Sequence, residues 1–174
     1  MNEVQPRPSR TPRDMALSLV VLLIPVLLIV LAYHALQGGD QPIVIDPAPT
    51  VARAQATAAF PVAVPHDLAA GWRPVSATYA PAGGGSTLRI GYLTPAGAGV
   101  QLVQSDVPVD ALLAAELGAG RQLRGAEEVD GRAWQRYAAR HDETAYVRTE
   151  NRRTIIVIGP ASAGELRALA AATG

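Results

Sequence analysis

The most apolar part of the chain is a continuous run from Ala16 to Leu36, which contains no formally charged residue. A helix of this length would extend about 32 Å, close to the roughly 30 Å hydrocarbon core of a bilayer. Pro25 lies in the middle of the run, and a helix surrounded by lipid tolerates the kink that it introduces. The pattern therefore predicts a transmembrane helix over residues 16–36.

The sequence on either side of this run predicts that it is retained and how it is oriented. Signal-peptide cores are shorter, at about 7 to 15 residues, and no Ala-x-Ala cleavage site follows here. Arg7, Arg10 and Arg13 precede the run, whereas the first basic residue after it is Arg53. Because basic residues favour the cytoplasmic side, we expect a cytoplasmic tail over residues 1–15 and an extracytoplasmic C-terminal part, held at the plasma membrane by a single pass.

Beyond the apolar run the composition changes twice. Residues 37–65 are rich in Gly, Pro and Ala, which disfavours long regular elements and predicts an extracytoplasmic tether. Within this tether, Thr50–Ala59 is expected to form a short helix capped by Thr50. Alternating polar and apolar positions begin at Trp72, so we expect a folded domain over residues 66–174.

This domain divides into two halves with the same order of elements. Each half begins near a Trp, continues through three segments of strand-like alternation and ends in an Ala- and Leu-rich helical segment. The order predicts a pseudo-duplicated βββα unit, with residues 120–131 as the connecting segment. The expected strands are residues 72–79, 87–94, 100–105, 132–140, 144–150 and 154–159, and the expected helices are residues 106–118 and 162–173.

Together these elements predict an α+β fold. An antiparallel sheet with its helices packed on one face would form a two-layer sandwich. The segment Thr154–Ile158 is apolar at successive positions, which predicts a central strand covered on both sides. Ser162 and Glu165 have the spacing of a capping box at the start of the closing helix.

Composition excludes several classes of function. Lys and Arg together number 15, as do Asp and Glu, so no net basic field is available to recruit nucleic acid. All of the basic residues are Arg, so an Arg on a surface carries little information by itself. The absence of Cys excludes disulfides, thiolate metal sites and a Cys nucleophile.

Motifs that would indicate catalysis or a cofactor are missing from the sequence. Gly83–Thr87 is glycine-rich but lacks the Lys of a phosphate-binding loop. The three His residues have no i, i+4 spacing for a metal, and no Gly-x-Ser-x-Gly elbow occurs. The sequence therefore predicts no catalytic residue, no cofactor and no metal, and we expect a protein that is not an enzyme.

One acidic group leaves an alternative open. Glu127, Glu128 and Asp130 lie close together in the sequence and have the chemistry for general acid–base work. The favoured interpretation is that they are loop charges that balance Arg121, Arg124 and Arg132. A carbohydrate-active or hydrolase-like envelope enzyme, with carboxylates assembled by the fold, is therefore the alternative function.

Alternation along the expected strands suggests one binding face. If the apolar positions of these strands face the helices, Arg89 and Arg148 point to the opposite face of the sheet. Arg136 lies two residues after Trp134, so both side chains point to the same face of their strand and can share that opposite face. Guanidinium groups beside an indole can hold an anionic or carbohydrate ligand. The alternative interpretation is that Arg occupies polar strand positions because the chain uses no Lys. The apolar positions assumed to face the helices are Leu88, Ile90, Tyr92, Ala145 and Val147.

Several stretches, in this order, resemble an actinobacterial single-pass membrane family catalogued as domain of unknown function 4245. The resemblance covers roughly residues 13 to 173 and implies a membrane anchor with an extracytoplasmic domain. It implies no activity, cofactor or site residue. The stretches are "RDMALSLVVLLIPVLLIV", "FPVAVPHDLAAGWRPVSATY", "LRIGYLTPAG", "QLVQSD", "VDGRAWQRY" and "TIIVIGPASAGELRALA".

These observations predict a non-catalytic binding or interaction domain of the cell envelope. The expected partners are the lipid bilayer, through residues 16–36, and an envelope protein or glycan. A structural subunit that uses the kinked span to pair with another membrane protein is a further hypothesis.

Overall fold

The computed structural model describes residues 12–37 and 43–174, which belong to two compact units, Met1–Pro42 and Ile43–Gly174. Most of the predicted cytoplasmic tail, residues 1–11, and the start of the predicted tether, residues 38–42, lie outside the described residues.

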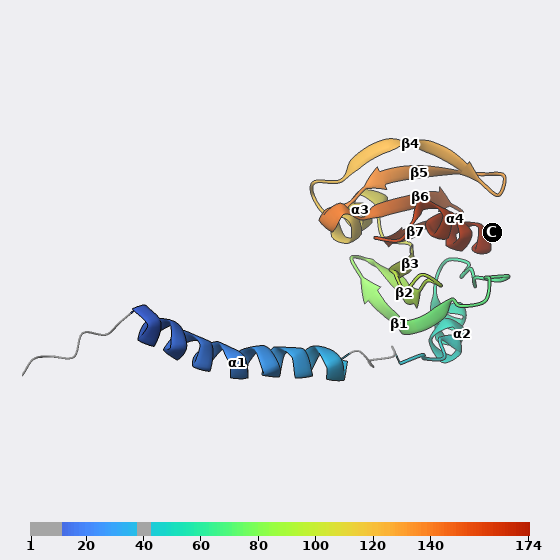
Figure 1. The fold of residues 1–174 in the computed structure, drawn as a ribbon. Helices are drawn as coiled ribbons and strands as arrows, with labels where there is room; N and C mark the ends of the chain where they lie inside the picture. The colour runs from blue at the N-terminus through green and yellow to red at the C-terminus, as the bar shows by residue number, and fades with distance from the viewer. Residues whose placement is uncertain (1–11, 38–42) are drawn as a thin grey trace, which may run out of the picture. The chain divides into compact units, whose positions relative to one another are not determined.

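Over its described residues, 12–37, the first unit is one helix, α1 (Pro12–Gln37), with Pro25 inside it (Figure 1). It includes the segment 16–36 that the apolar pattern predicts to be helical. Its large apolar side chains from Leu17 to Leu31 are all exposed, on every side of the helix. Among the residues that the structure describes, no helix combines enough length and apolar character to cross a membrane.

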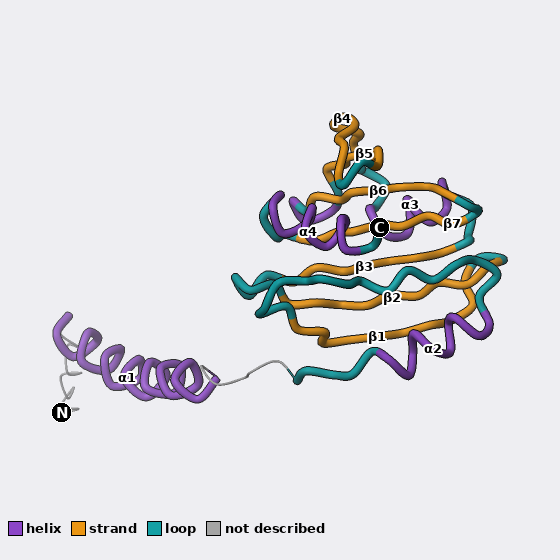
Figure 2. Tube along the Cα trace, turned by 90° about the vertical axis from the view of Figure 1, so that its right-hand side faces the viewer, coloured by secondary structure: helices purple, strands orange, loops and turns teal. Residues whose placement is uncertain are grey.

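The second unit is built on one antiparallel sheet of seven strands (Figures 1 and 2). Its strand order is β1-β2-β3-β7-β6-β5-β4, so the two central strands, β3 and β7, come from different halves of the sequence. The strands are β1 (Arg73–Ala82), β2 (Gly85–Leu93), β3 (Gly99–Ser105), β4 (Gln122–Val129), β5 (Arg132–Ala138), β6 (Thr144–Glu150) and β7 (Arg153–Gly159). The helices are α2 (Ala48–Thr57), α3 (Val109–Leu117) and α4 (Ala163–Ala172), with a short 3-10 turn, η1 (Arg140–Asp142).

The α+β class is confirmed, but the predicted order of the second half omits a strand. The connecting segment 120–131 contains β4, which pairs with β5 at the edge of the sheet. All of β4 except Glu127 and Val129 is exposed, so it lacks the apolar alternation that marks a strand with one buried face. A bulge between Leu123 and Gly125 interrupts its register further.

The prediction of helices on one face is wrong, because helices cover both faces of the sheet. Val51 of α2 and Leu166 of α4 pack in one apolar cluster with Ile155 and Val157 of β7. Leu112, Leu113 and Leu117 of α3 pack in another cluster with Ile156 and Ile158. Since neighbouring residues of a strand point to opposite faces, α3 lies on one side and α2 and α4 lie on the other. The prediction that β7 is central and covered on both sides is confirmed by the burial of all its residues.

The folded unit begins earlier than the sequence indicates. α2 begins at Ala48 after Pro47, rather than at a Thr50 cap, and buries Val51 and Ala54. The segment 43–65, expected to be part of the tether, therefore belongs to the same compact unit as the sheet. The predicted capping box is confirmed, since Ser162 Oγ accepts from the Glu165 amide while the Glu165 carboxylate accepts from the Ser162 amide.

Candidate functional site

Charged residues are buried at one end of the sheet, on the face that α2 and α4 cover. Arg148 and Glu150 lie on β6, Arg153 begins β7 after a tight turn, and Trp134 lies on β5. Alternation along β6 places Arg148 and Glu150 on one face, and Arg153 joins them because it pairs with Glu150 across the hairpin. We call Trp134, Arg148, Glu150 and Arg153 the guanidinium cluster.

The guanidinium cluster contains two buried cations and one carboxylate. The side chains of Arg148 and Arg153 are 7% and 6% exposed. Both donate to the same oxygen, Glu150 Oε1, from Arg148 Nη2 at 2.8 Å and from Arg153 Nη2 at 2.5 Å. With two positive charges and one negative charge, the cluster carries one uncompensated positive charge in a region where water is largely excluded.

Nitrogen donors of this cluster also lack hydrogen-bond partners. Arg148 Cζ lies 4.8 Å from the ring centroid of Trp134, a cation–π contact. Within the described residues, four buried side-chain nitrogens have no partner: Trp134 Nε1, Arg148 Nε, Arg148 Nη1 and Arg153 Nε. All four belong to three neighbouring residues. Because buried donors are normally satisfied, their concentration here indicates a place that favours an acceptor, above all a negatively charged one.

Burial and charge shift the ionisation of this cluster. Burial lowers the pKa of Arg148, and the neighbouring Arg132 and Arg153 lower it further, although Glu150 opposes them. Burial by itself would raise the pKa of Glu150, but hydrogen bonds and charges from Arg153 and Arg148 outweigh it and hold this pKa below its usual value. An added anion would relieve the repulsion between the two guanidinium groups.

A segment that precedes the sheet closes over this region. Residues 60–64 form the strap, which has no regular secondary structure. Arg153 Nη1 donates to the Pro61 carbonyl oxygen. Gln104, on the same face of β3, donates from Nε2 to the Ala63 carbonyl at 2.7 Å and accepts from the Ala63 amide at 2.8 Å. The strap is therefore fixed by Arg153 of the guanidinium cluster and by Gln104 beside it.

The four residues predicted to form one binding face do not lie together. Arg89 pairs across β3 with Val103, on the α3 face, and its guanidinium contacts Glu116 Oε1 at 2.5 Å. Arg148 lies on the opposite face, so the prediction that Arg89 and Arg148 share one open face is wrong. The error comes from placing Ala145 and Val147 with Leu88, whereas they belong to different clusters.

Trp134 and Arg148 are brought together as the sequence suggested, but inside the domain instead of on an open surface. Arg136 is exposed on the Trp134 face of β5. Its charge lowers the pKa of Glu127, after the larger effects of hydrogen bonds from Arg167 and Tyr146. Arg136 therefore flanks the site without joining the buried cluster.

The acidic group of the alternative function does not assemble into a carboxylate pair. Glu127 accepts hydrogen bonds from Arg167 at 2.7 Å and from Tyr146 at 3.0 Å. Glu128 is the next residue of β4, so its side chain points to the opposite face. Asp130 lies beyond the end of the strand in a turn, with a left-handed φ of 52°.

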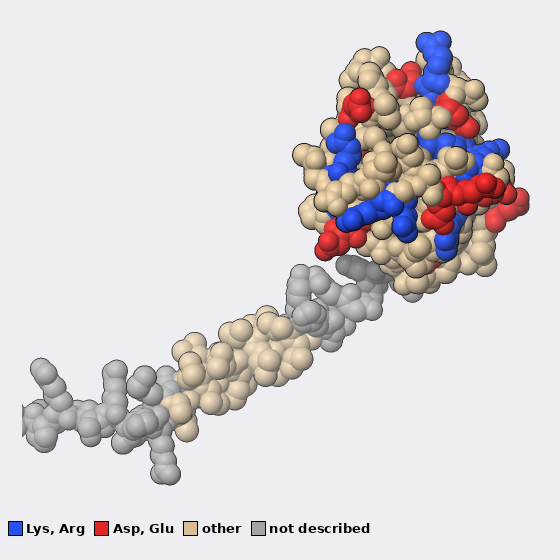
Figure 3. All heavy atoms as spheres, turned by 90° about the horizontal axis from the view of Figure 1, so that it is seen from above, with Lys and Arg blue, Asp and Glu red and all other residues tan. Residues whose placement is uncertain are grey.

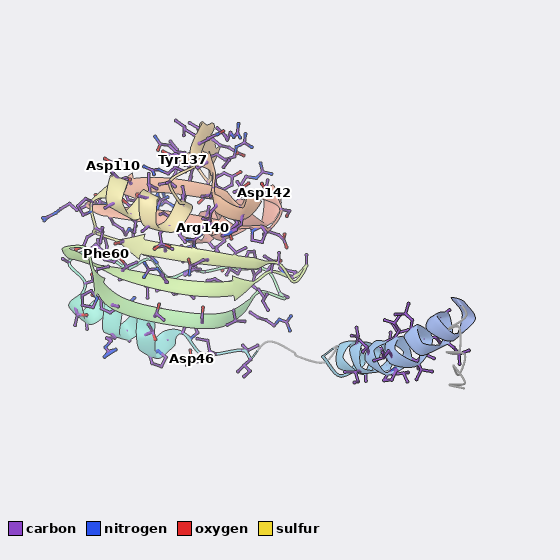
Figure 4. The ribbon with its side chains drawn as sticks, turned by 90° about the vertical axis from the view of Figure 1, so that its left-hand side faces the viewer. Asp46, Phe60, Asp110, Tyr137, Arg140 and Asp142 are labelled. Carbon is purple, nitrogen blue, oxygen red and sulfur yellow. The ribbon has the colours of Figure 1, made fainter. Side chains whose placement is uncertain are left out.

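A hollow of about 310 Å³ lies at the other end of β3 and β7. Gln101, Arg140 and Glu143 contribute its polar side chains, and Figure 4 labels Arg140 beside Tyr137 and Asp142. Arg140 Nε and Glu143 Oε2 lie 3.9 Å apart, so the two charges largely neutralise each other. Arg140 also donates to the Ala115 carbonyl of α3 at 3.4 Å. This hollow has no buried, unpartnered donors and is the weaker candidate.

Sequence reasoning missed Glu150, Arg153 and Gln104. Glu150 and Arg153 flank a two-residue turn, where charged residues are usually solvated, and Gln104 lies in an apolar strand. The available signal was Gln104 itself, an uncharged polar residue at a position that alternation assigns to the core. No group of metal-binding side chains occurs in the part of the chain that the structure describes.

The fold and site define a class of protein: a small α+β domain with one antiparallel sheet, helices on both faces and a buried, donor-rich charged cluster. The chain matches the family model described as protein of unknown function (DUF4245) over residues 7–173, and it belongs to that family. No curated protein matches the chain, and no solved structure matches it.

Proposed function

We propose that the chain is a membrane-anchored binding protein of the cell envelope, whose folded domain binds an anionic ligand at the guanidinium cluster. The observation that supports binding is that all four unpartnered buried nitrogens, among the described residues, belong to Trp134, Arg148 and Arg153. One carboxylate for two buried guanidinium groups supports a ligand with a negative charge. The function proposed is non-catalytic.

The anchor in this proposal is residues 16–36, with the N-terminus in the cytoplasm and the domain outside. It is supported by the uncharged apolar run and by the three Arg residues before it. The single-pass topology and the actinobacterial source remain predictions.

The ligand class follows from the donors. Guanidinium and indole N–H groups donate and do not accept, so the site fits carboxylate, sulfate or phosphate oxygens. Acidic glycans and acidic protein segments of an envelope carry such groups. Glu127, Glu150, Glu116 and Glu143 are each engaged by an Arg, so no observation favours the hydrolase-like alternative.

The test uses Trp134 as a reporter inside the site. The full chain with Trp72→Phe, purified in detergent, contains a single Trp and is titrated with acetate, sulfate, inorganic phosphate and glucuronate at constant ionic strength. We expect one of these anions to change the Trp134 emission saturably and to raise the midpoint of thermal unfolding. Chloride at matched ionic strength is the salt control.

Two variants locate the effect. Arg148→Met removes one of the two buried cations but leaves Glu150 paired with Arg153, and it should abolish the anion response. Arg136→Gln changes an exposed Arg on the same face and should retain the response. A folded protein that responds to no anion, or whose Arg148→Met variant responds as the parent does, would refute the proposal.

A further inference from the structure

The hydrogen-bonded ladder between β5 and β6 ends beside the guanidinium cluster. It stops at Gln135 and Val147, before either strand ends. Continued in the same register, the ladder would place Arg132 opposite Glu150. Glu150 instead accepts hydrogen bonds from the two Arg residues of the cluster. Arg132 therefore lies on a part of β5 that is not joined to β6.

Arg132 is a third cation on the face of the guanidinium cluster. It lies two residues before Trp134, so both side chains point to the same side of β5. Val129, its partner on β4, packs in the apolar cluster of that face. The guanidinium of Arg132 reaches Gly174 beyond α4, because a Cβ built on Gly174 would collide with it. The charge of Arg132 is also one of those that lower the pKa of Arg148, so Arg132 borders the cluster.

No carboxylate neutralises this third cation within residues 12–37 and 43–174, since no ion pair there includes Arg132. Asp130 lies only two positions earlier in the chain but forms no ion pair with it, and Glu127 is held by Arg167. Figure 3 looks down on β4 and β5 and shows basic side chains gathered over this part of the domain, with acidic ones beside them. Together with the excess charge of the guanidinium cluster, Arg132 leaves the site with two uncompensated positive charges.

Given the proposed anion-binding function, on which this inference rests, we propose that the ligand carries a doubly charged phosphate group and that Arg132 selects for its second charge. Two uncompensated positive charges match two negative charges. The unpartnered donors belong to three residues, Trp134, Arg148 and Arg153. A phosphate group has three oxygens that accept hydrogen bonds, whereas a carboxylate has two. Arg132 is then a specificity residue at the border of the site.

The test compares anions of similar shape and different charge. Methyl phosphate carries two negative charges well above its second pKa, which is about 6, whereas methyl sulfate carries one. The full chain with Trp72→Phe, in detergent, is titrated with each anion at slightly alkaline pH and constant ionic strength, and Trp134 emission reports binding. We expect methyl phosphate to bind about ten-fold more tightly than methyl sulfate.

Inorganic phosphate is the third probe and identifies the source of the phosphate group. Binding at least as tight as that of methyl phosphate supports the proposal with the free ion as ligand. Weaker binding than that of methyl phosphate supports it with a phosphate ester of a larger molecule as ligand.

Three variants test the role of Arg132. Arg132→Gln should reduce the preference for methyl phosphate to about two-fold and leave the affinity for methyl sulfate nearly unchanged. Arg132→Lys keeps the charge and should keep most of the preference, which separates charge from packing against Gly174. Arg124→Gln removes the same charge from an exposed bulge position in β4 and should behave as the parent does.

The outcomes separate this proposal from the proposed function. If the parent binds no anion, the anion-binding function itself fails. If the parent binds methyl sulfate as tightly as methyl phosphate, or if the preference survives Arg132→Gln, the site binds anions but does not select a doubly charged phosphate group. Circular dichroism verifies the fold of each variant.

Discussion

The side-chain amide of Gln104 forms two hydrogen bonds with the backbone of one residue, Ala63, which lies 41 positions earlier in the chain. Gln104 is completely buried, and its amide presents to Ala63 the same donor and acceptor that a neighbouring strand would present. This side chain therefore extends the hydrogen bonding of the sheet to the strap, and it holds the strap next to the guanidinium cluster.

Replacing Gln104 should release the strap. Gln104→Leu leaves the Ala63 N–H and C=O unpaired, and we expect a loss of about 2 to 4 kcal/mol in the free energy of unfolding. Urea denaturation measures this loss, and hydrogen exchange at the Ala63 amide should accelerate. Gln101→Leu, on the opposite face of the same strand, is the control. If both variants lose the same stability, the Gln104–Ala63 bridge has no special role.

Glu150 should give the domain an acid-dependent stability. Its pKa is lower in the folded state than its usual value, so the folded protein binds a proton less readily than the unfolded chain. The stability that Glu150 contributes is therefore complete above the usual carboxyl pKa. It is lost as the pH falls through the pKa that Glu150 has in the folded protein. Glu150→Gln removes the only carboxylate of two buried guanidinium groups and should destabilise the domain by about 3 kcal/mol at neutral pH.

The difference between the parent and Glu150→Gln should shrink as the pH falls below about 4. Denaturation curves at a series of pH values measure it. Glu128→Gln, at an exposed position that forms no ion pair among the described residues, should run parallel to the parent throughout. A constant difference between parent and Glu150→Gln would show that the ionisation of Glu150 is not linked to folding.

Arg89 should act as the structural partner of Glu116. The Glu116 side chain is 6% exposed, and its Oε1 accepts hydrogen bonds from both Nε and Nη2 of Arg89. Arg89→Leu leaves this carboxylate buried without its cation, so we expect a loss of about 3 kcal/mol. Adding Glu116→Leu should recover most of the loss, because the remaining surfaces are apolar.

Arg136→Leu is the control for Arg89, since Arg136 is exposed and should change stability by less than about 0.5 kcal/mol. Chemical denaturation of the single and double variants provides the measurement. Equal effects of Arg89→Leu and Arg136→Leu would restore the interpretation of Arg89 as an unengaged surface residue.

The sequence predicted the strands that have a regular buried face and failed where burial is unusual. β2, β3, β6 and β7 follow from alternation or from apolar runs. β4 was missed because nearly all of it is exposed. The successive apolar positions of β7 already required cover on both sides, and this requirement is incompatible with helices on one face. The apolar pattern of β7, if applied to the whole sheet, predicts α3 and α4 on opposite faces.

The candidate site was predictable only in part, because its contacts are distant in the sequence. Trp134 and Arg148 lie on neighbouring strands, at positions whose side chains point to the same face of the sheet. Alternation within each strand can detect such positions. The contact between Arg153 and Pro61 joins residues 92 positions apart, and no local pattern indicates it. Arg89 was misplaced because the strands of the two halves were aligned as though one helical layer covered both.

Gly159 should be essential for joining the two halves of the sheet. It ends β7 where this strand passes the start of β3. A Cβ at position 159 would collide with the Gly99 carbonyl oxygen and lie 3.1 Å from Val100 Cα. Both are backbone atoms of the neighbouring central strand, so they cannot move aside as a flexible side chain would.

We therefore expect Gly159→Ala to destabilise the domain by about 2 to 3 kcal/mol. Gly120→Ala is the matched control, because a Cβ at that position meets nothing within 4 Å, and its effect should stay within about 0.5 kcal/mol. Urea denaturation compares the two variants, and hydrogen exchange locates the loss, which should be largest at the amides shared by β3 and β7. If Gly159→Ala is as stable as Gly120→Ala, the two central strands do not approach as closely as described, and the joint between the halves has a different geometry.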